Sequence, residues 1–137
     1  MKALQDAIFT RLASSATITA GIGTFAGVPA IFTRRPVPGK APARRITISP
    51  SIGDESWDTK TSGGRDVITD VIVWHEESGD PSLVESLAEE VRDLFHRKPV
   101  DVVGYGNWLC ECGGPIENDD DQMYGRVITM RHVLVKA

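Results

Sequence analysis

Residues 65–95 read RDVITDVIVWHEESGDPSLVESLAEEVRDLF, and this stretch decides the fold. Its first ten residues, Arg65 to Trp74, alternate with the period of two that is typical of a β-strand. One face of that strand carries Val67, Thr69, Val71 and Val73, and the other carries Ile68, Asp70, Ile72 and Trp74. Because both faces are rich in β-branched apolar side chains, the strand is predicted to lie in the centre of a sheet.

The second half of the stretch predicts an amphipathic helix over residues 82–97. Asp80 can cap this helix, and Pro81 suits its first position because no N–H is needed there. Apolar residues recur at helical spacing along one face: Val84, Leu87, Ala88, Val91, Leu94 and Phe95. Glu89 and Glu90 fall on the opposite face, where solvated carboxylates are expected rather than a catalytic pair.

Upstream of the strand, residues 3–13 predict a first amphipathic helix, and residues 17–20 could add a further turn. The apolar stripe of the first helix consists of Leu4, Ala7, Ile8, Phe9 and Leu12. The glycines of residues 21–27 superficially suggest a phosphate-binding loop, but their spacing differs and no strand precedes them, so a flexible connector is expected. A short edge strand at residues 29–33 and an alternating strand at residues 45–49 follow.

Residues 34–45, RRPVPGKAPARR, predict a stiff, exposed, basic loop. Its cations are Arg34, Arg35, Lys40, Arg44 and Arg45, and the segment contains no acidic residue. These charges could meet phosphates or an acidic protein surface, or they could simply be solvated. Because no aromatic side chains are interleaved with them for base stacking, direct binding of nucleic acid is disfavoured.

Residues 53–64, GDESWDTKTSGG, predict a long, mobile hairpin arm, because the segment is polar, rich in glycine and flanked by strands. Together with the basic loop, the arm supplies the candidate interface residues, which here are Asp54, Glu55, Trp57, Asp58 and Lys60. Trp57 is the most informative of them, because an exposed tryptophan is favoured at interfaces. The alternative is that its side chain folds back on the sheet.

Downstream of the second helix, a strand is predicted at residues 108–112, an acidic turn at 117–121 and a long strand at 124–135. The elements therefore follow the order α-β-β-β-α-β-β. A chain of 137 residues is long enough for one continuous core and short for two. We expect one α+β domain over residues 1–137, with a mixed, largely antiparallel sheet flanked by two helices.

The composition argues against several classes of protein. With a net charge of −4, the chain lacks the positive field of a dedicated binder of nucleic acid or anionic membranes. Its first residues lack the apolar run of a secretory signal, and no stretch reaches the ~18 apolar residues of a membrane span. We therefore expect a cytosolic chain. We also expect reduced cysteines, because the i, i+2 spacing of Cys110 and Cys112 is poor for a disulfide.

No pattern of residues predicts a catalytic or cofactor site. The side chains that could form a soft-metal site are Cys110, Cys112, His75, His96 and His132. Structural zinc sites space paired thiolates more widely, so small strand residues are the preferred interpretation of the cysteines. Asp119 to Asp121 lack the spacing of a calcium loop, and no Gly-x-Ser-x-Gly elbow occurs. We therefore predict no enzyme activity, no metal and no cofactor.

Four segments together resemble one protein family. They are ALQDAIFTRLASSATITAGIG (residues 3–23), GVPAIF (27–32), DVITDVIVWHEESGDPSLVESLAEEVRDLF (66–95) and DDDQMYGRVITMRHVLVKA (119–137). In the last of them, an acidic turn and an aromatic-glycine pair lead into the final strand. In content and order, these segments are similar to the tail terminator, or tail completion, proteins of long-tailed phages and their relatives in gene transfer agents.

The resemblance implies a structural virion protein that assembles in the host cytoplasm as a hexameric ring on the head-proximal end of the tail tube. The ring would stop tube polymerisation and join the tail to the head connector. Implied partners are further copies of the chain, the major tail tube protein and the head connector or stopper protein, with the tape-measure protein as a further candidate. No membrane is involved, and DNA contact is expected only in the ring lumen.

A closed ring needs a head-to-tail interface, for which exposed strand edges and hairpin arms are natural material. Residues 34–45 and 53–64 are therefore the candidate contact segments. Two alternatives remain. The chain could be another neck or head-completion protein, or a small cytosolic ligand-binding or enzymatic α+β domain.

Overall fold

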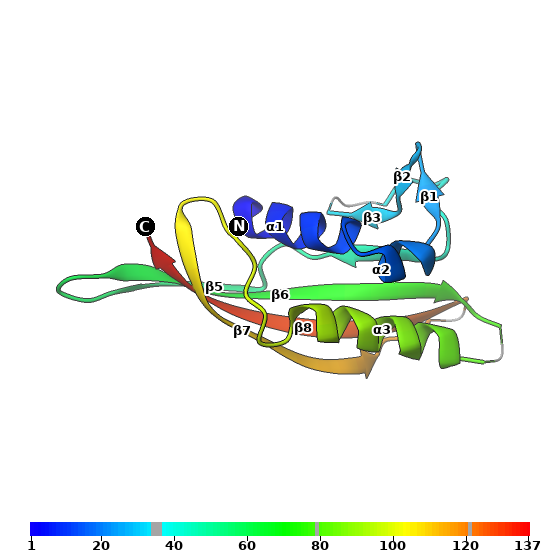
Figure 1. Ribbon diagram of the computed structural model, residues 1–137. Helices are drawn as coiled ribbons and strands as arrows, with labels where there is room; N and C mark the ends of the chain where they lie inside the picture. Colours follow the sequence, from blue (N-terminus) through cyan, green and yellow to red (C-terminus); the bar gives the residue numbers. More distant parts are fainter. Residues whose placement is uncertain (34–36, 79, 121) are drawn as a thin grey trace.

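The computed structural model describes residues 1–33, 37–78, 80–120 and 122–137. Within them, three helices accompany a mixed sheet whose strands are mostly antiparallel, which confirms the predicted α+β class (Figure 1). In chain order the elements are α1 (Lys2–Ala13), α2 (Ala16–Ala20), β1 (Thr24–Phe25), β2 (Val28–Pro29), β3 (Ile31–Phe32), β4 (Arg45–Ile48), β5 (Gly53–Asp58), β6 (Gly63–Glu76), α3 (Ser82–Phe95), β7 (Tyr105–Glu117) and β8 (Met123–Lys136).

The main sheet of the described residues has six strands, in the order β3-β4-β6-β8-β7, with β5 also pairing with β6. One side of β6 pairs with β5 over residues 63–68 and with β4 over residues 71–74, and its other side pairs with β8. This arrangement confirms the predicted central position of β6. The pair β3–β4 is parallel, and every other pair in the sheet is antiparallel.

The hydrophobic core lies on one face of the sheet, between the strands and the helices. The predicted inward residues of β6, Val67, Val71 and Val73, are fully buried in one cluster with the apolar stripes of α1 and α3. Leu4, Ile8 and Leu12 are the buried residues of α1. Because a fully buried aliphatic side chain contributes about 1.5–3 kcal/mol, this layer is the main source of stability.

Arg11 links α1 to the C-terminal end of α3. Its guanidinium donates hydrogen bonds to the carbonyls of Lys98 and Pro99, the second over 2.9 Å, and lies 5.5 Å from the centre of the Phe95 ring. These two carbonyls belong to the segment after α3, and Arg11 also donates to the Leu94 carbonyl in the last turn of the helix over 3.4 Å, where a cation complements the helix dipole. Arg11 therefore fixes the relative position of the two helices.

Helix α3 begins and ends close to its predicted limits. The helix begins at Ser82, so Pro81 occupies the N-cap position predicted for Asp80, and the Asp80 carboxylate instead accepts a hydrogen bond of 3.0 Å from the Ser82 backbone N–H from one residue further out. The helix ends at Phe95, two residues before the predicted limit of Arg97.

The prediction of a flexible connector at residues 21–27 needs correction. Residues 24–29 form a separate two-stranded hairpin, β1–β2, which packs beside the main sheet rather than joining it. Its turn is built on Ala26 and Gly27, both of which have positive φ angles of 52° and 82°. A two-residue turn with this backbone is typical of tight hairpins, and the dipeptide Ala-Gly is a weak sequence signal for it.

Candidate assembly interface

The predicted hairpin arm is present. Strands β5 and β6 pair from Gly53 to Asp58, and the arm extends beyond the helices at one end of the molecule (Figure 1). Its turn is closed by the Thr59 backbone N–H, which donates to the Ser62 carbonyl over 2.7 Å, and by the Thr59 hydroxyl. The sequence signal for a hairpin is therefore confirmed, while the mobility of the arm stays a prediction.

Trp57 lies on this arm and is half-buried. Its indole packs against Gly64, its register partner on β6. The indole Nε1 is shielded from solvent and has no hydrogen-bond partner among the described residues. The structure thus favours the second interpretation of Trp57, a side chain folded back on the sheet, although part of the ring remains accessible.

The charged residues of the arm divide into two groups. Asp54 accepts hydrogen bonds from Arg65, the Nε donor lying at 2.8 Å, and this contact together with Tyr105 raises the pKa of Arg65. Asp54 is therefore part of the arm's own structure. The other predicted interface residues, Glu55, Asp58 and Lys60, are exposed and form no ion pair among the described residues, so they remain available to a partner.

One cation of the basic loop has an acidic partner from outside that segment. The Arg44 guanidinium forms a bidentate pair with Glu76, with hydrogen bonds of 2.8 and 3.0 Å to Oε1. The hydrogen bond raises the pKa of Arg44 and lowers the pKa of Glu76. Glu76 lies 32 residues further along the chain, so the sequence pattern of the loop could not reveal the pair.

The remaining cations of the loop differ from one another. Arg45 begins strand β4, is half-buried, and donates to the Pro42 carbonyl over 3.2 Å. Lys40 is exposed and unpaired within the described residues. Arg34 and Arg35 lie outside the described residues. Of the three predicted cations that the structure describes, Lys40 is thus the one that is both exposed and without an ion pair or a hydrogen-bonded carbonyl partner.

Strand β7 carries an exposed tryptophan, Trp108, which is not among the predicted interface residues. Among the described strands, β7 pairs with β8 alone, and its other edge is covered in part, since the Arg97 N–H donates to the Cys110 carbonyl over 2.8 Å and the Cys112 N–H donates to His96 Nδ1 over 3.1 Å. The register shifts between Asn107 and Leu109 and again between Gly113 and Ile116. Trp108 lies at the first of these bulges and is 76% exposed, because a bulge turns a side chain out of the regular alternation. Because residues 108–112 have the pattern of a regular strand, the sequence does not reveal that the Trp108 side chain is exposed.

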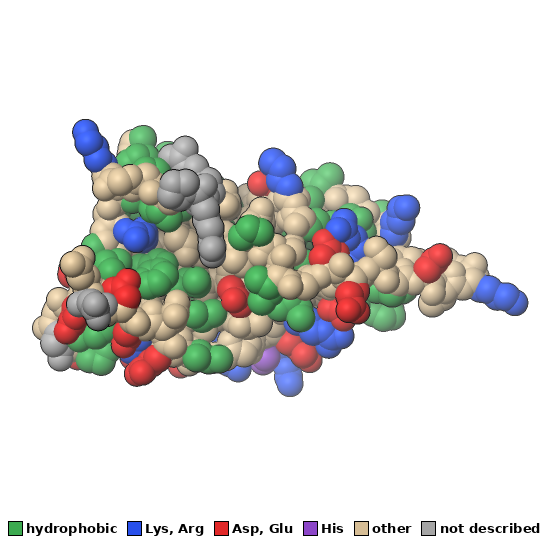
Figure 2. All heavy atoms as spheres, turned by 180° about the vertical axis from the view of Figure 1, so that it is seen from behind, with side chains coloured by type: hydrophobic (Ala, Val, Ile, Leu, Met, Phe, Trp, Pro, Cys, Tyr) green, Lys and Arg blue, Asp and Glu red, His purple; other side chains and the backbone are tan. Residues whose placement is uncertain are grey.

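The uncovered face of the sheet also bears apolar side chains. Ile68, Ile72 and Trp74 of β6 lie on it and are half-exposed. Its polar groups largely pair with one another, as Asp66 does with Arg131 over 2.7 Å. Figure 2, the view from behind Figure 1, shows hydrophobic side chains in small groups among acidic and basic ones. Such patches are typical of surfaces that meet other proteins.

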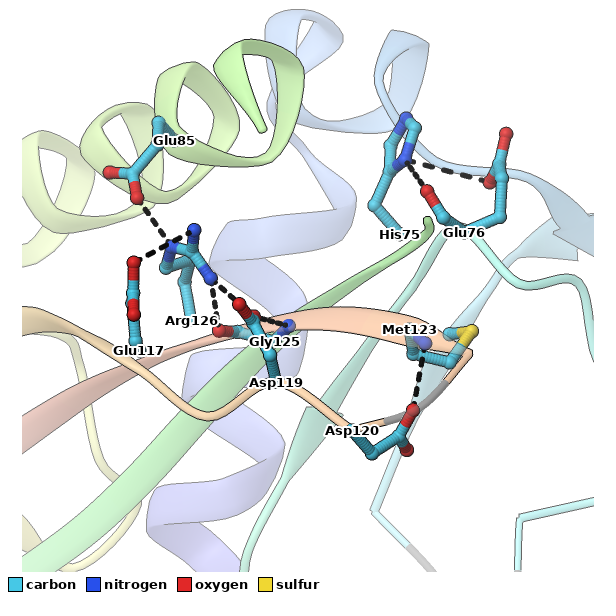
Figure 3. A network of polar contacts seen from close by, with 9 residues as sticks. All are labelled: His75, Glu76, Glu85, Glu117, Asp119, Asp120, Met123, Gly125 and Arg126. Atoms are coloured by element: carbon cyan, nitrogen blue, oxygen red, sulfur yellow. Dashed lines mark hydrogen bonds and ion pairs between the residues drawn. The ribbon is translucent and has the colours of Figure 1, made fainter. Parts of the chain in front are cut away.

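A buried arginine holds the acidic turn against α3 (Figure 3). The Arg126 side chain is 2% exposed, and it donates to Glu85 of α3 and, over 2.5 Å, to Asp119 of the turn. Burial alone would lower the pKa of Arg126, but the hydrogen bonds to these carboxylates outweigh the effect of burial, so the pKa is raised.

The acidic turn is also held by its own backbone. Asp119 and Asp120 accept hydrogen bonds from backbone N–H groups within the turn. These bonds give Asp119 and Asp120 a structural role in forming the turn and in holding it in place.

The buried histidine and cysteines form no recognisable reaction centre. Burial, with a smaller effect of Arg11, lowers the pKa of His132 to about 4, so the ring is neutral at pH 7. Cys110 Sγ lies 3.8 Å from His132 Nε2, and both cysteines are free and buried. A hydrogen bond with Cys112 together with burial raises the pKa of the Cys110 thiol, which disfavours the reactive thiolate. The described residues contain no group of three or more side chains suited to a metal ion.

The described helices are all too short or too polar to cross a lipid bilayer.

The sequence matches neither a protein-family model nor a curated protein. Its fold does match solved structures. A chain from the virion of a native gene transfer agent particle has a TM-score of 0.80 at 16% identity, and the match covers 96% of this chain and 94% of that chain. A second solved chain has a TM-score of 0.62 at 14% identity, covering 97% of this chain and 94% of that chain. At such identities the likeness establishes a shared fold over nearly the whole chain.

Proposed function

We propose that this protein is a structural component of a phage-like virion and works as a tail terminator. Six copies form a ring on the head-proximal end of the tail tube, stop tube polymerisation and provide the surface that the head connector meets. The observation that carries the proposal is the shared fold with a chain of a gene transfer agent particle, with a TM-score of 0.80.

The surfaces of the chain support an assembly role. The β5–β6 arm extends beyond the body, β7 has no second strand beside it within the described residues, and Trp108 of β7 stands exposed. A lone protein usually protects such edges, whereas a ring can cover them between neighbouring copies. Glu55, Asp58, Lys60 and Lys40 are the predicted interface residues that remain accessible for these contacts.

The test is assembly of tail tubes from the tube protein of the same genome, with and without this chain. Electron microscopy should reveal a six-fold ring on one end of each tube, and tubes of limited length when the chain is present. Tubes of unlimited length without end rings would contradict termination. Binding of the chain to the head connector alone, without any effect on tubes, would favour the second candidate, another neck or head-completion protein.

A further inference from the structure

The tip of the β1–β2 hairpin is an apolar projection. It consists of Phe25, Ala26, Gly27 and Val28, and the Val28 residue is 54% exposed. No charged residue occurs anywhere between Leu12 and Thr33. We call residues 25–28 the knob. An uncharged, exposed apolar tip is unfavourable in water unless another surface covers it.

The knob is held in one conformation. The Phe25 ring packs edge-on against Phe32 of β3 with the ring centres 5.6 Å apart, and Ala30 N–H donates to the Gly23 carbonyl over 2.9 Å. Because the hairpin is ordered before any contact forms, little conformational entropy is lost when the knob is buried. Such preorganisation increases affinity.

A groove runs between α1 and residues 99–103, with a volume of about 720 Å³. Ala3, Ala7 and Thr10 line one wall, and Val100 and Val103 line the other. Val103 stands at the rim and is 88% exposed. Pockets that bind drug-sized molecules span roughly 300–1,000 Å³, so the groove has room for several apolar side chains.

The charges at the two places are complementary. Of the charged residues that line the groove, Lys2 and Asp6 pair over 2.7 Å and Arg11 donates to the Lys98 and Pro99 carbonyls, whereas Asp101 is exposed and forms no ion pair among the described residues. The basic loop lies beside the hairpin, since Gly23 N–H donates to the Arg44 carbonyl over 2.8 Å. On that loop Lys40 is exposed and unpaired within the described residues. An acid at the groove and a cation beside the knob therefore lack partners within one copy.

The knob and the groove lie at different ends of the molecule. Figure 1 shows the β1–β2 hairpin beyond the C-terminal end of α1, while the segment leading from α3 to β7 passes the N-terminal part of α1. A contact between two such places on neighbouring copies is head-to-tail. Repeated head-to-tail contacts close into a ring when the rotation from one copy to the next is a whole fraction of a full turn.

We propose that the β1–β2 knob of one copy inserts into the α1 groove of the next, with Lys40 beside Asp101 of that neighbour. The inference rests on the proposed ring and identifies one contact within it. The occupant is a second copy, because the unpaired acid Asp101 lies at the groove and the unpaired cation Lys40 lies on the loop beside the hairpin.

The first test is sedimentation velocity and native mass spectrometry of the purified chain over a concentration series. Val28→Asp in the knob and Val103→Asp at the groove should each weaken self-association by about tenfold or more, as expected for central apolar contacts. Leu83→Asp is the matched control, because Leu83 is 58% exposed but belongs to neither surface. All three positions are exposed, so folding should be unchanged, which circular dichroism checks.

The second test uses mixtures. An isotope-labelled Val28→Asp copy retains a groove, and a Val103→Asp copy retains a knob, so mixing them should produce a one-to-one heterodimer and no ring. Lys40→Asp and Asp101→Lys should each weaken association, and combining them in one chain should restore it. Both results require a head-to-tail contact at these places.

The opposite results would contradict the proposed contact between the knob and the groove. A wild type that stays monomeric throughout the series, or variants that associate as well as the wild type, would exclude knob-in-groove packing. Loss of tube binding by Val103→Asp with self-association intact would assign the groove to the tube protein instead. In each case, rings seen on tubes would leave the proposed terminator function standing, so the two failures are distinguishable.

Discussion

Trp57 on β5 and Gly64 on β6 are register partners, and the indole ring occupies the space that a side chain at position 64 would need. A Cβ at that position would lie 2.5 Å from the ring and would also meet the backbone carbonyl of Leu134 on β8. The close approach of three strands at the base of the arm therefore depends on a glycine.

Gly64→Ala should destabilise the protein by about 1–3 kcal/mol, because the ring and the β8 backbone must both shift. The measurement is thermal or urea unfolding followed by circular dichroism. Gly106→Ala on β7 is the matched control, since the nearest atom to a Cβ there is 3.9 Å away. Equal stability of the two variants would contradict the packing described for Trp57.

Arg126→Met should cost about 2–3 kcal/mol, because it leaves Glu85, Glu117 and Asp119 close together without their shared cation. Arg131→Met on the same strand is the control. The Arg131 side chain is 48% exposed and pairs at the surface, so its loss should cost less than about 1 kcal/mol. Arg126→Lys should recover part of the stability, since an ammonium cannot reproduce the forked contacts. Similar losses for the two methionine variants would refute the structural role of Arg126.

The pH dependence of stability should contain a contribution from His132. Burial holds its folded pKa near 4, below the unfolded value of 6.5, so the unfolded state binds an extra proton between these limits. Stability should therefore fall as the pH drops from about 6.5 to 4, by up to about 3 kcal/mol from this group.

His132→Leu should flatten that part of the pH profile while changing stability at pH 7 much less. Asn107, which faces the histidine at 3.3 Å, keeps its hydrogen bond to the Val100 carbonyl in the variant. Urea unfolding at a series of pH values measures the difference between the two proteins. Carboxylates such as Glu76, whose pKa is lowered, act in the same direction at lower pH but contribute to both profiles. Parallel profiles would mean that folding does not lower the pKa of His132.

Trp108→Ala should leave stability within about 0.5 kcal/mol of the wild type, because the side chain is mostly exposed. Under the proposed ring function it should nevertheless weaken assembly, which native mass spectrometry or end-ring counts on tubes would measure. Trp74→Ala is the contrasting variant. Its indole donates to Thr47 over 3.1 Å and packs on Gly125, so it should lose stability. A strongly destabilised Trp108→Ala would place that ring in the fold instead.

The sequence predicts the elements whose pattern is long and periodic. Residues 65–95 show both a period of two and a helical stripe over many residues, and β6 and α3 lie there. The arm was also predictable, because polar and glycine residues separate two strand patterns. In contrast, the β1–β2 hairpin has strands of two residues each, which are too short for alternation to be seen.

The candidate interface was predicted less well than the fold, for a physical reason. Exposure depends on contacts between residues distant in the chain. Arg44 is neutralised by Glu76, Asp54 by Arg65, and Trp57 packs on Gly64. Conversely, Trp108 is exposed because of a bulge that the residue pattern does not encode. Composition identified the charged loop and the arm, but only the pairing of strands reveals which of their side chains remain free.

The position of β8 between β6 and β7 has a consequence for truncated forms of the chain. Both neighbours use β8 as their pairing partner, so a chain cut before Met123 lacks an inner strand of its main sheet. Such a fragment would expose one unpaired edge on β6 and one on β7, and it should be cleaved by proteases more readily than the intact chain.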